Sequence, residues 1–472
     1  MPQTRPSSDT LAWMWYALGL GVVALSTTLS WLSHSFSEEV ASADLPNLPY
    51  LGLLIGGTAF VVYAIVMRLH AADSTSKWPL FLFVFIIGIA ARIVQFGAVP
   101  ILEDDYQRYL WDGALLANGL SPYLYAPLSF LNAVVEAPAY WDLAETAWPV
   151  IERINHPEYR TVYPPVAQMF FAMSYWISPL SLEGWRVVLL FADISVFALL
   201  VGILRALGQS QMWAALYWWH PLAIKEVANS AHLEPALMVF VLAALWAAMA
   251  ARYRIATIFL VLGFGVKVWP LLLMAPLLWS LRRSPVLALQ CVIMFGVGAA
   301  VMMWPVISAG LTETSGFVAF ARGWAASSSA ILVSDFLAQG LGGLLGIDAP
   351  ALLSRVLLGL ALSGVIIITC LRQNETPFGM ARSIFIITAA LFLLSPSVTP
   401  WYALWLLPFL CIFPHPALLL ASVLIGLHYS YFPLAQIDQS ALYRYGVVWV
   451  IWVPVWGLLG WKLLRKGPSH VE

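Results

Sequence analysis

The sequence predicts an all-α, polytopic integral membrane protein, and its composition and the spacing of its apolar residues carry this prediction. Of the 472 residues, 61% are hydrophobic and 10% are charged, whereas soluble globular proteins carry about 25% charged residues. Long apolar stretches alternate with short polar segments along the whole chain. Such stretches cross a bilayer as helices, because lipid offers no hydrogen-bonding partners to free backbone groups.

The apolar stretches predict about 11–14 transmembrane helices within a single membrane domain that covers residues 1–472. The stretch 212–224 is short for a span and polar residues follow it directly, which favours a half-span or a re-entrant element. The stretch 255–281 has basic residues at both ends, which favours two short arms. The stretches are 11–33, 50–67, 78–99, 163–180, 187–204, 212–224, 235–251, 255–281, 286–307, 351–371, 380–397, 401–413, 416–432 and 446–461.

Lys and Arg predict which loops are cytoplasmic, because cytoplasmic loops of membrane proteins are enriched in both residues. This orientation places segment 103–162 outside as the first large outer loop and segment 308–350 outside as the second. Segment 394–402 falls on the same side. Within the first outer loop, the pattern of "YWDLAETAWPVIERI" predicts short interfacial helices. The basic residues that set the orientation are Arg68, Lys77, Arg252, Arg254, Arg282, Arg283, Arg372, Lys462, Arg465 and Lys466.

The composition also excludes several classes of function. A formal net charge of -1, without a basic stripe, argues against a nucleic-acid partner. Cys291, Cys370 and Cys411 lie in or beside apolar stretches, so neither a disulfide framework nor a zinc site is predicted. The sequence contains no glycine-rich phosphate loop that would bind a nucleotide donor. The lipid bilayer is the partner that the composition predicts.

Three consecutive acids, Glu103, Asp104 and Asp105, follow the third apolar stretch at the predicted outer surface. Carboxylates at such a position can act as a general base toward an acceptor hydroxyl, or bind a divalent cation. A third interpretation is a solvated helix start, where the helix dipole favours acids. If the segment is helical, Asp105, Tyr109 and Asp112 share one face, and Asp104, Arg108 and Trp111 share the next.

Other polar residues are also candidates for a site. Ionisable residues in apolar surroundings are costly and often functional, and Lys225, Glu226, His232 and Glu234 form such a group. Lys225 and Glu226 can equally form a structural pair. Lys267 is either functional or a lysine whose ammonium reaches the membrane surface.

For the remaining candidates, a structural interpretation stands beside the functional one. Arg108 is either a partner of Asp104 within one helix or a phosphate ligand. His156 contributes to a site or satisfies a loop carbonyl, and Arg322 lies in the second outer loop. Trp401 and Tyr402 are aromatics of the membrane interface or a stacking wall for a sugar. Tyr163 precedes two prolines that favour a helix start.

Five segments between about residues 78 and 415 occur in a recognisable order. They are "DDYQRYLWDGALLANGLSPYLYAP" (Asp104–Pro127), "VYPPVAQMFF" (Val162–Phe171), "WWHPLAIKEVANSAHLE" (Trp218–Glu234), "LGFGVKVWPLLLMAPLL" and "LSPSVTPWYALWLLPF". Together they resemble motifs of the GT-C superfamily of membrane glycosyltransferases, most closely its bacterial mannosyltransferase-like members. The sequence departs from the pattern at His220, where Asn is usual, at Glu234, where Asp is usual, and at Thr399, where His is common.

The resemblance implies a GT-C-like fold and a glycosyltransferase that takes a sugar, mannose or another hexose or pentose, from a polyprenyl-phosphate donor. The acceptor would be a glycolipid or a polysaccharide. The resemblance implies Asp105 as the general base of an inverting transfer, with Asp104 as the second choice.

A Mg or Mn ion at Asp104 and Asp105 is possible but not required. The active site would lie on the periplasmic side of a bacterial inner membrane, and a lipid-linked sugar flippase or secondary transporter is the alternative function. The expected substrate-binding residues are Arg108, Tyr109, Trp111, Asp112, Tyr123, His156, Tyr163, Glu226, His232, Glu234, Lys267, Arg322, Trp401 and Tyr402.

Overall fold

The computed structural model describes residues 8–36, 47–71, 78–346 and 349–465, and most of them are helical. In this part of the chain, extended pairing is limited to two isolated bridges, Arg160 with Ser315 and Ala326 with Ser397. Lys77 and Lys466, which contributed to the predicted orientation, lie outside the described residues. The all-α class is confirmed for the described residues.

The helices follow one another with short connections. They are α1 (Ser8–Ser33), α2 (Asn47–Ala71), α3 (Trp78–Ile93), α4 (Asp105–Ala117), α5 (Pro127–Leu131), α6 (Pro138–Ile151), α7 (Pro165–Ile177), α8 (Leu182–Ala206), α9 (Ala215–Trp218), α10 (Pro221–Ile224), α11 (Glu234–Met249), α12 (Tyr253–Phe264), α13 (Met274–Ser280), α14 (Pro285–Ser308), α15 (Gly316–Gly323), α16 (Ser329–Leu345), α17 (Pro350–Leu371), α18 (Pro377–Leu394), α19 (Ala403–Ile412), α20 (Pro416–Leu424), α21 (Tyr431–Gln436), α22 (Ser440–Leu442) and α23 (Val448–Arg465). Two π-helical turns occupy Lys225–Asn229 and Tyr443–Val447. Short 3₁₀ turns occupy His34–Phe36, Gln211–Ala214, Trp269–Leu273, Pro400–Tyr402 and Ile425–Ser430.

Among the described residues, eight helices are long and apolar enough to cross a membrane, and a bent pair makes nine if it is one span. By length and composition the chain is a multi-pass helical membrane protein. The eight are Ala12–Phe36, Leu48–His70, Leu182–Ala206, Pro285–Ser308, Pro350–Leu371, Pro377–Leu394, Pro416–Gln436 and Ser440–Lys462. Shorter apolar helices are Trp78–Ile93, Tyr253–Phe264, Trp269–Ser280, Ser329–Leu344 and Pro400–Ile412.

Two irregular segments match their predictions. After the short helices around 212–224, Pro221–Asn229 and Glu234–Met249 meet at 117°, as a broken span or a re-entrant loop does. The stretch 255–281 consists of two short arms, Tyr253–Phe264 and Trp269–Ser280. Segment 308–350, which we expected to be an outer loop, contains the helices α15 and α16.

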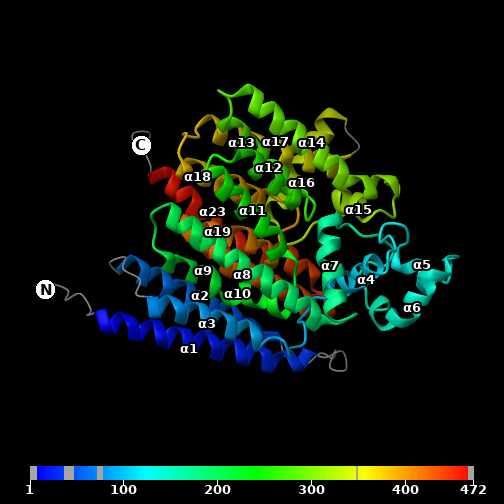
Figure 1. Cartoon of the computed structure of the whole chain (residues 1–472), viewed down its shortest axis with the longest axis horizontal. Coiled ribbons are helices and arrows are strands. Elements are labelled where there is room, and N and C mark those ends of the chain that lie inside the picture. Colours follow the sequence, from blue (N-terminus) through cyan, green and yellow to red (C-terminus); the bar gives the residue numbers. More distant parts are fainter. Residues whose placement is uncertain (1–7, 37–46, 72–77, 347–348, 466–472) are drawn as a thin grey trace.

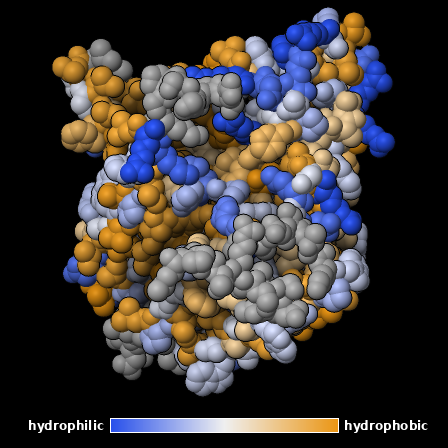
Figure 2. Space-filling model, turned by 90° about the vertical axis from the view of Figure 1, so that its left-hand side faces the viewer, coloured by the Kyte–Doolittle hydropathy of each residue, from blue (hydrophilic) through white to orange (hydrophobic). Residues whose placement is uncertain are grey.

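The long helices α1, α2, α3 and α8 lie side by side, and α4, α5 and α6 gather at one end of the molecule, here called the loop end (Figure 1). The start of α1 and the end of α23 lie at the opposite end (Figure 1). Figure 2 looks at that opposite end, where hydrophilic groups stand among largely apolar flanks. At the loop end, the two bridges join the segments around Arg160, Ser315 and Ser397. Segments 103–162, 308–350 and 394–402, which are all predicted to lie on the outer side, therefore meet here.

A buried ion pair fixes α3 against α8. The Arg92 guanidinium lies 2.5 Å from Asp193, and neither side chain is more than 1% exposed. Tyr217 donates a hydrogen bond to Asp193, and the Arg92 guanidinium lies 3.7 Å from the ring centroid of Trp218. Gly88 permits this packing, because a Cβ there would lie 2.0 Å from the Trp218 indole nitrogen. The pair therefore joins three stretches that are remote in sequence.

Removing one partner of this pair should destabilise the protein strongly. We expect Asp193→Leu to lower the free energy of unfolding by about 3–5 kcal/mol, because it leaves a buried guanidinium without a counter-ion. The double variant Arg92→Met/Asp193→Leu should recover most of the loss, since it removes both charges. Denaturant unfolding of the purified protein in detergent measures both effects. A double variant no more stable than the single one would contradict this account.

Candidate functional site

The connection between α3 and α4 is clamped from one side by residues of other helices. The Asn229 carboxamide donates to the Val99 carbonyl at 2.8 Å and accepts from the Ile101 N–H at 3.1 Å. The Arg186 guanidinium donates to two further carbonyls of the same connection, at 2.6 and 2.8 Å. These contacts satisfy the backbone of a non-helical segment, which is required in an apolar interior. They also fix the position of Glu103, which follows directly.

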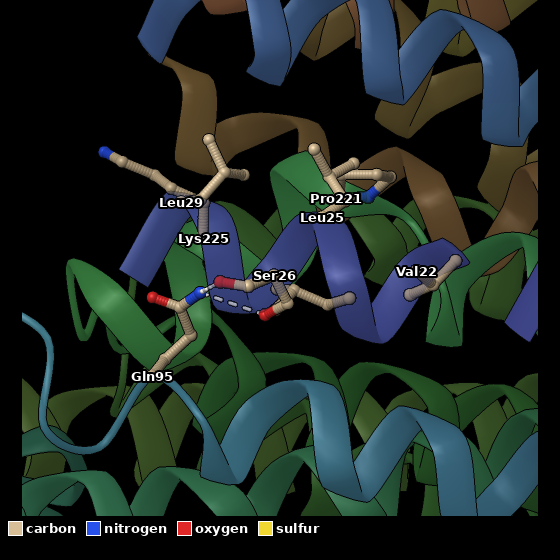
Figure 3. A pocket seen from close by; sticks show the side chains of 8 residues that line it. Val22, Leu25, Ser26, Leu29, Gln95, Pro221 and Lys225 are labelled. Atoms are coloured by element: carbon tan, nitrogen blue, oxygen red, sulfur yellow. Dashed lines mark hydrogen bonds between the residues drawn. The ribbon is translucent and has the colours of Figure 1, made fainter. Parts of the chain in front are cut away.

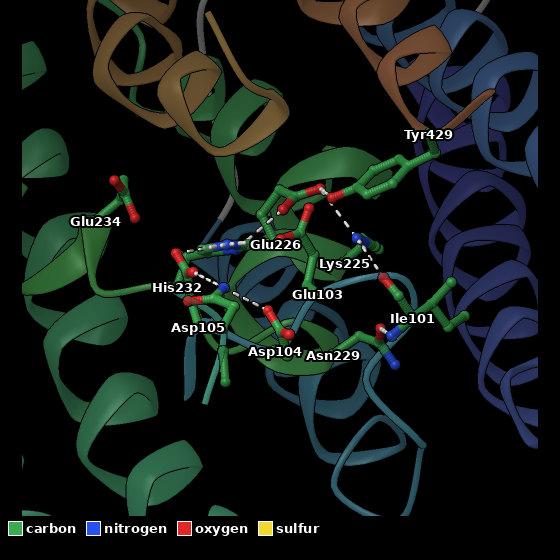
Figure 4. A network of polar contacts seen from close by, with 12 residues as sticks. Ile101, Glu103, Asp104, Asp105, Lys225, Glu226, Asn229, His232, Glu234 and Tyr429 are labelled. Atoms are coloured by element: carbon green, nitrogen blue, oxygen red, sulfur yellow. Dashed lines mark hydrogen bonds and ion pairs between the residues drawn. The ribbon is translucent and has the colours of Figure 1, made fainter. Parts of the chain in front are cut away.

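The side chain of His232 is completely buried among carboxylates (Figure 4). Its Nδ1 lies 3.2 Å from Glu226 Oε2. Its Nε2 lies 3.7 Å from Glu103 Oε2 and 4.0 Å from Asp105 Oδ2. The imidazole stacks on Trp401, with 4.0 Å between ring centroids and 15° between planes. One histidine thus faces three carboxylates that come from two distant parts of the sequence.

Behind His232, the network continues into the protein. Glu226 accepts a 2.7 Å hydrogen bond from the Tyr429 hydroxyl, and the Lys225 ammonium lies 3.5 Å from the same carboxylate. The ammonium also lies 3.5 Å from the centroid of the Tyr429 ring and donates to the Ile101 carbonyl at 3.4 Å (Figure 4). Both charges are buried, and such pairs persist only when they are also hydrogen-bonded.

The space on the other side of Lys225 is too small for a substrate. A cavity of about 10 Å³ lies there, lined in part by Ser26 and Gln95, which is about the room that one water needs. Gln95 donates to the Ser26 carbonyl and hydroxyl at 2.7 and 2.9 Å, and the Lys225 ammonium points away from both residues (Figure 3). This cavity therefore has room for a water molecule and not for a substrate.

Asp104 and Asp105 lie on the solvent side of the network. The Asn155 carboxamide nitrogen donates to both carboxylates, at 2.5 Å to Asp104 and 2.9 Å to Asp105. The side chain of Asp105 is 26% exposed and that of Glu103 is 7% exposed. Burial raises the pKa of Glu103 to about 7, against the opposing effect of His232. Desolvation and the neighbouring charge of Asp105 raise the pKa of Asp104.

Three non-glycine residues beside the site adopt the left-handed backbone conformation. Leu102, with φ 56°, precedes Glu103, and Ala231, with φ 59°, precedes His232. His156, with φ 47°, follows Asn155. Such residues are uncommon, and they concentrate at functional sites, where the surrounding structure holds them in place. The π-helical turn Lys225–Asn229 is a second irregularity of this kind.

Residues after α15 form part of the rim of the candidate site, which is the edge around Asp104 and Asp105. The Trp324 ring lies 4.6 Å from that of His156, centroid to centroid. The His156 side chain is 52% exposed, and its Nδ1 lies 3.5 Å from Glu158. Arg322, in the last turn of α15, is exposed. The two segments predicted as outer loops are therefore in contact beside the acids.

Tyr109, Tyr163 and Tyr123 form an aromatic layer against α7. The hydroxyl of Tyr163 lies 3.3 Å from that of Tyr109, which stacks on Phe171 at 4.7 Å. The Tyr123 hydroxyl donates to the Tyr163 carbonyl at 2.9 Å. Burial raises the pKa of Tyr163, and the charge of Asp105 adds to the rise. Tyr163 and Tyr109 are therefore candidates for the wall behind Asp105.

Three other predicted residues of α4 point away from His232. Arg108 donates to the carbonyls of Asn155, His156 and Tyr159, at 3.0–3.3 Å. It therefore anchors the 155–159 segment, which is neither of the two roles predicted for it, an Asp104 partner or a phosphate ligand. Trp111 packs edge-on against Phe130, and Asp112 accepts from Gln168 at 3.0 Å. Burial raises the pKa of Asp112 to about 6.

Glu234 forms a separate ion pair with Lys267. The Lys267 ammonium lies 5.1 Å from the Tyr402 ring centroid and 5.6 Å from that of Trp405, and Tyr402 stacks on Trp405 at 4.0 Å. In Figure 4, Glu234 stands apart from the carboxylates around His232. Lys267 therefore serves as the counter-ion of Glu234 at the start of α11.

Asn155 is the hydrogen-bond donor that the two aspartates share. Its carboxamide nitrogen donates to both carboxylates, which accept hydrogen bonds when ionised. Among the described residues, no group of three or more His, Cys, Asp or Glu side chains is arranged to hold a metal ion. Asp104 and Asp105 are the residues that would hold a divalent cation, together with oxygens of water or of a phosphate.

Neither Asn155 nor Tyr429 stands out in the sequence, and Glu103 stands out only as the first of three consecutive acids. No pattern in the sequence marks Asn155, because it contacts the acids from 50 and 51 positions away. Tyr429 lies 203 positions from Glu226. The two positive-φ residues Leu102 and Ala231 are ordinary apolar residues that give no signal in sequence.

No protein-family model, no curated protein and no solved structure matches this chain.

The raised pKa of Glu103 predicts how stability depends on pH. The ordinary pKa of 4.5 rises to about 7 on folding, so the folded state holds this proton more tightly. The stabilising contribution is fully present below pH 4.5 and is lost as the pH rises to about 7. As the pH rises across this interval, we expect the melting temperature of Glu103→Gln to fall less than that of the wild type. Thermal denaturation in a pH series measures this.

The control for this experiment is Glu145→Gln, which neutralises an exposed acid of α6. It should show the wild-type slope of melting temperature against pH. An unchanged slope in Glu103→Gln would mean that another group titrates in this interval.

Proposed function

We propose that the chain is a GT-C-like membrane glycosyltransferase. It moves a sugar, mannose or another hexose or pentose, from a polyprenyl-phosphate donor to a hydroxyl of a glycolipid or polysaccharide acceptor. One observation carries the proposal: Asp105 combines exposure to solvent with a position 4.0 Å from a fully buried histidine that Glu226 holds on its other side. A base at the mouth of a membrane protein needs both access and a fixed electrostatic environment.

In the proposed mechanism, the Asp105 carboxylate takes the proton from the acceptor hydroxyl. The hydroxyl oxygen attacks the anomeric carbon from the face opposite the phosphate, forming the new C–O bond. The bond between that carbon and the phosphate oxygen breaks, and its electron pair leaves with the polyprenyl phosphate. The anomeric configuration is inverted. Asp104, joined to Asp105 through Asn155, is the second choice for the base.

The leaving phosphate gains negative charge and would be stabilised by nearby cations. Of the cations named from the sequence, Arg108 is engaged with backbone carbonyls and Lys267 with Glu234. Arg322 and His156 are exposed on the rim. These two are therefore our proposed contacts to the lipid phosphate.

The finer topology belongs to this proposal. The eight long helices, the bent pair and some of the shorter apolar helices would make up the predicted 11–14 crossings. The loop end would face the periplasm of a bacterial inner membrane. A lipid-borne donor fits this placement, because its prenyl tail remains in the bilayer while its phosphate reaches the interface.

The alternative function is a lipid-linked sugar flippase or secondary transporter. The observation that favours it is the fully buried Lys225, Glu226 and His232, since ionisable residues at membrane depth also mark transport routes. Movement of a fluorescent polyprenyl-phosphate sugar across proteoliposomes, without formation of a new glycoside, would support this alternative over the transferase.

Substitution of Asp105 should abolish sugar transfer. We expect Asp105→Asn to lower transfer from radiolabelled polyprenyl-phosphate sugars to membrane-lipid acceptors by at least about 100-fold, because the general base is lost. Asp104→Asn should retain more activity. The measurement uses purified protein in lipid, with and without a chelator, and a rate that falls with the chelator would show that a divalent cation takes part.

The matched control is Glu145→Gln, which removes an exposed acid from the same segment, and it should transfer at the wild-type rate. All variants should melt near the wild-type temperature, so that loss of activity is not loss of fold. If Asp105→Asn turns over normally, the assignment of the base is wrong.

A further inference from the structure

A groove of about 490 Å³ runs between α1 and α2, away from the site described above. Apolar and small side chains of both helices line it, and one cation, Arg68, also lines it. Its volume is typical of a site for a small organic ligand. Its lining matches the interior of a bilayer rather than water, so a lipid chain is the expected occupant.

The shape of the groove follows from one close approach of the two helices. A Cβ at Gly57 would lie 2.4 Å from the end of the Leu25 side chain, so the glycine leaves room for Leu25 where α1 and α2 meet. Met14, near the start of α1, and Arg68, near the end of α2, also line the groove. Both lie toward the end of the molecule that is opposite the loop end (Figure 1).

Two of the three guanidinium nitrogens of Arg68 lack a hydrogen-bond partner among the described residues. Among the described residues, its Nε and Nη1 atoms have no hydrogen-bond partner, and both atoms are shielded from solvent. A guanidinium that extended to the membrane surface to contact water would expose both nitrogen atoms to solvent. Shielded donors beside apolar surface are costly when they remain unpaired. The guanidinium fork matches the oxygens of a phosphate.

We propose that this groove binds one anionic phospholipid, with an acyl chain between α1 and α2 and the phosphate on Arg68. Basic pockets between transmembrane helices bind lipid head groups in this way. The occupant is a bilayer phospholipid rather than the sugar donor, because Arg68, the cation of the groove, lies near the end of α2 that is opposite the acids. The lipid site is independent of the proposed transferase activity.

Native mass spectrometry tests the proposal. The full-length protein is equilibrated with equal amounts of phosphatidylglycerol and phosphatidylcholine of the same chain composition, and the retained lipids are counted. The wild type should retain phosphatidylglycerol preferentially. Arg68→Gln should lower this preference about fivefold, the contribution of one arginine near a membrane surface. Equal retention of both lipids by the wild type would overturn the proposal.

Two further variants separate head-group from chain contacts. Arg205→Gln is the matched control, because Arg205 is an exposed basic residue in the last turn of α8, and it should keep the preference. Gly21→Phe fills the groove at a position with open space around the Cβ, so it should lower retention of both lipids. A preference that survives in Arg68→Gln, or displacement of phosphatidylglycerol by an equal amount of polyprenyl phosphate, would overturn the assignment.

Discussion

The enclosure of His232 by carboxylates determines the arrangement of the loop end. Glu226 holds one ring nitrogen, while Glu103 and Asp105 face the other. Glu226 and Glu103 are buried, and a buried carboxylate is costly without a cation or a hydrogen-bond donor. The histidine and Lys225 are therefore requirements of the fold as much as candidates for chemistry, and they force α4, the π-helical turn and α11 to meet at one point.

The backbone around this cluster is irregular beside the charged side chains. The clamp formed by Asn229 and Arg186 satisfies the carbonyls and N–H groups of the connection before Glu103. That support allows Leu102 to adopt an unfavourable left-handed conformation, which aims the next side chain inward. On the solvent side, Asn155 stabilises the cluster, because its single amide group donates hydrogen bonds to two neighbouring aspartates of like charge.

The sequence was sufficient for the class of fold and for the break before α11, because hydrophobic length is visible in one dimension. It also marked several charged residues of the candidate site, because ionisable residues stand out in an apolar sequence. It was insufficient for contacts. Arg108 was interpreted through its charge, whereas its guanidinium donates three hydrogen bonds to backbone carbonyls of one loop. The Arg92–Asp193 pair joins residues 101 positions apart, and no local pattern pairs one buried arginine with one buried aspartate.

The cluster around His232 draws on residues from widely separated parts of the chain, and this separation has a consequence for biosynthesis. The ribosome makes Glu103 and Asp105 early, whereas Trp401 and Tyr429, which cover the histidine and its glutamate, come from the last quarter of the chain. A nascent chain therefore carries its acids with an incomplete enclosure until synthesis is nearly finished. Truncated chains would expose this unfinished cluster to the proteases and chaperones that survey the membrane.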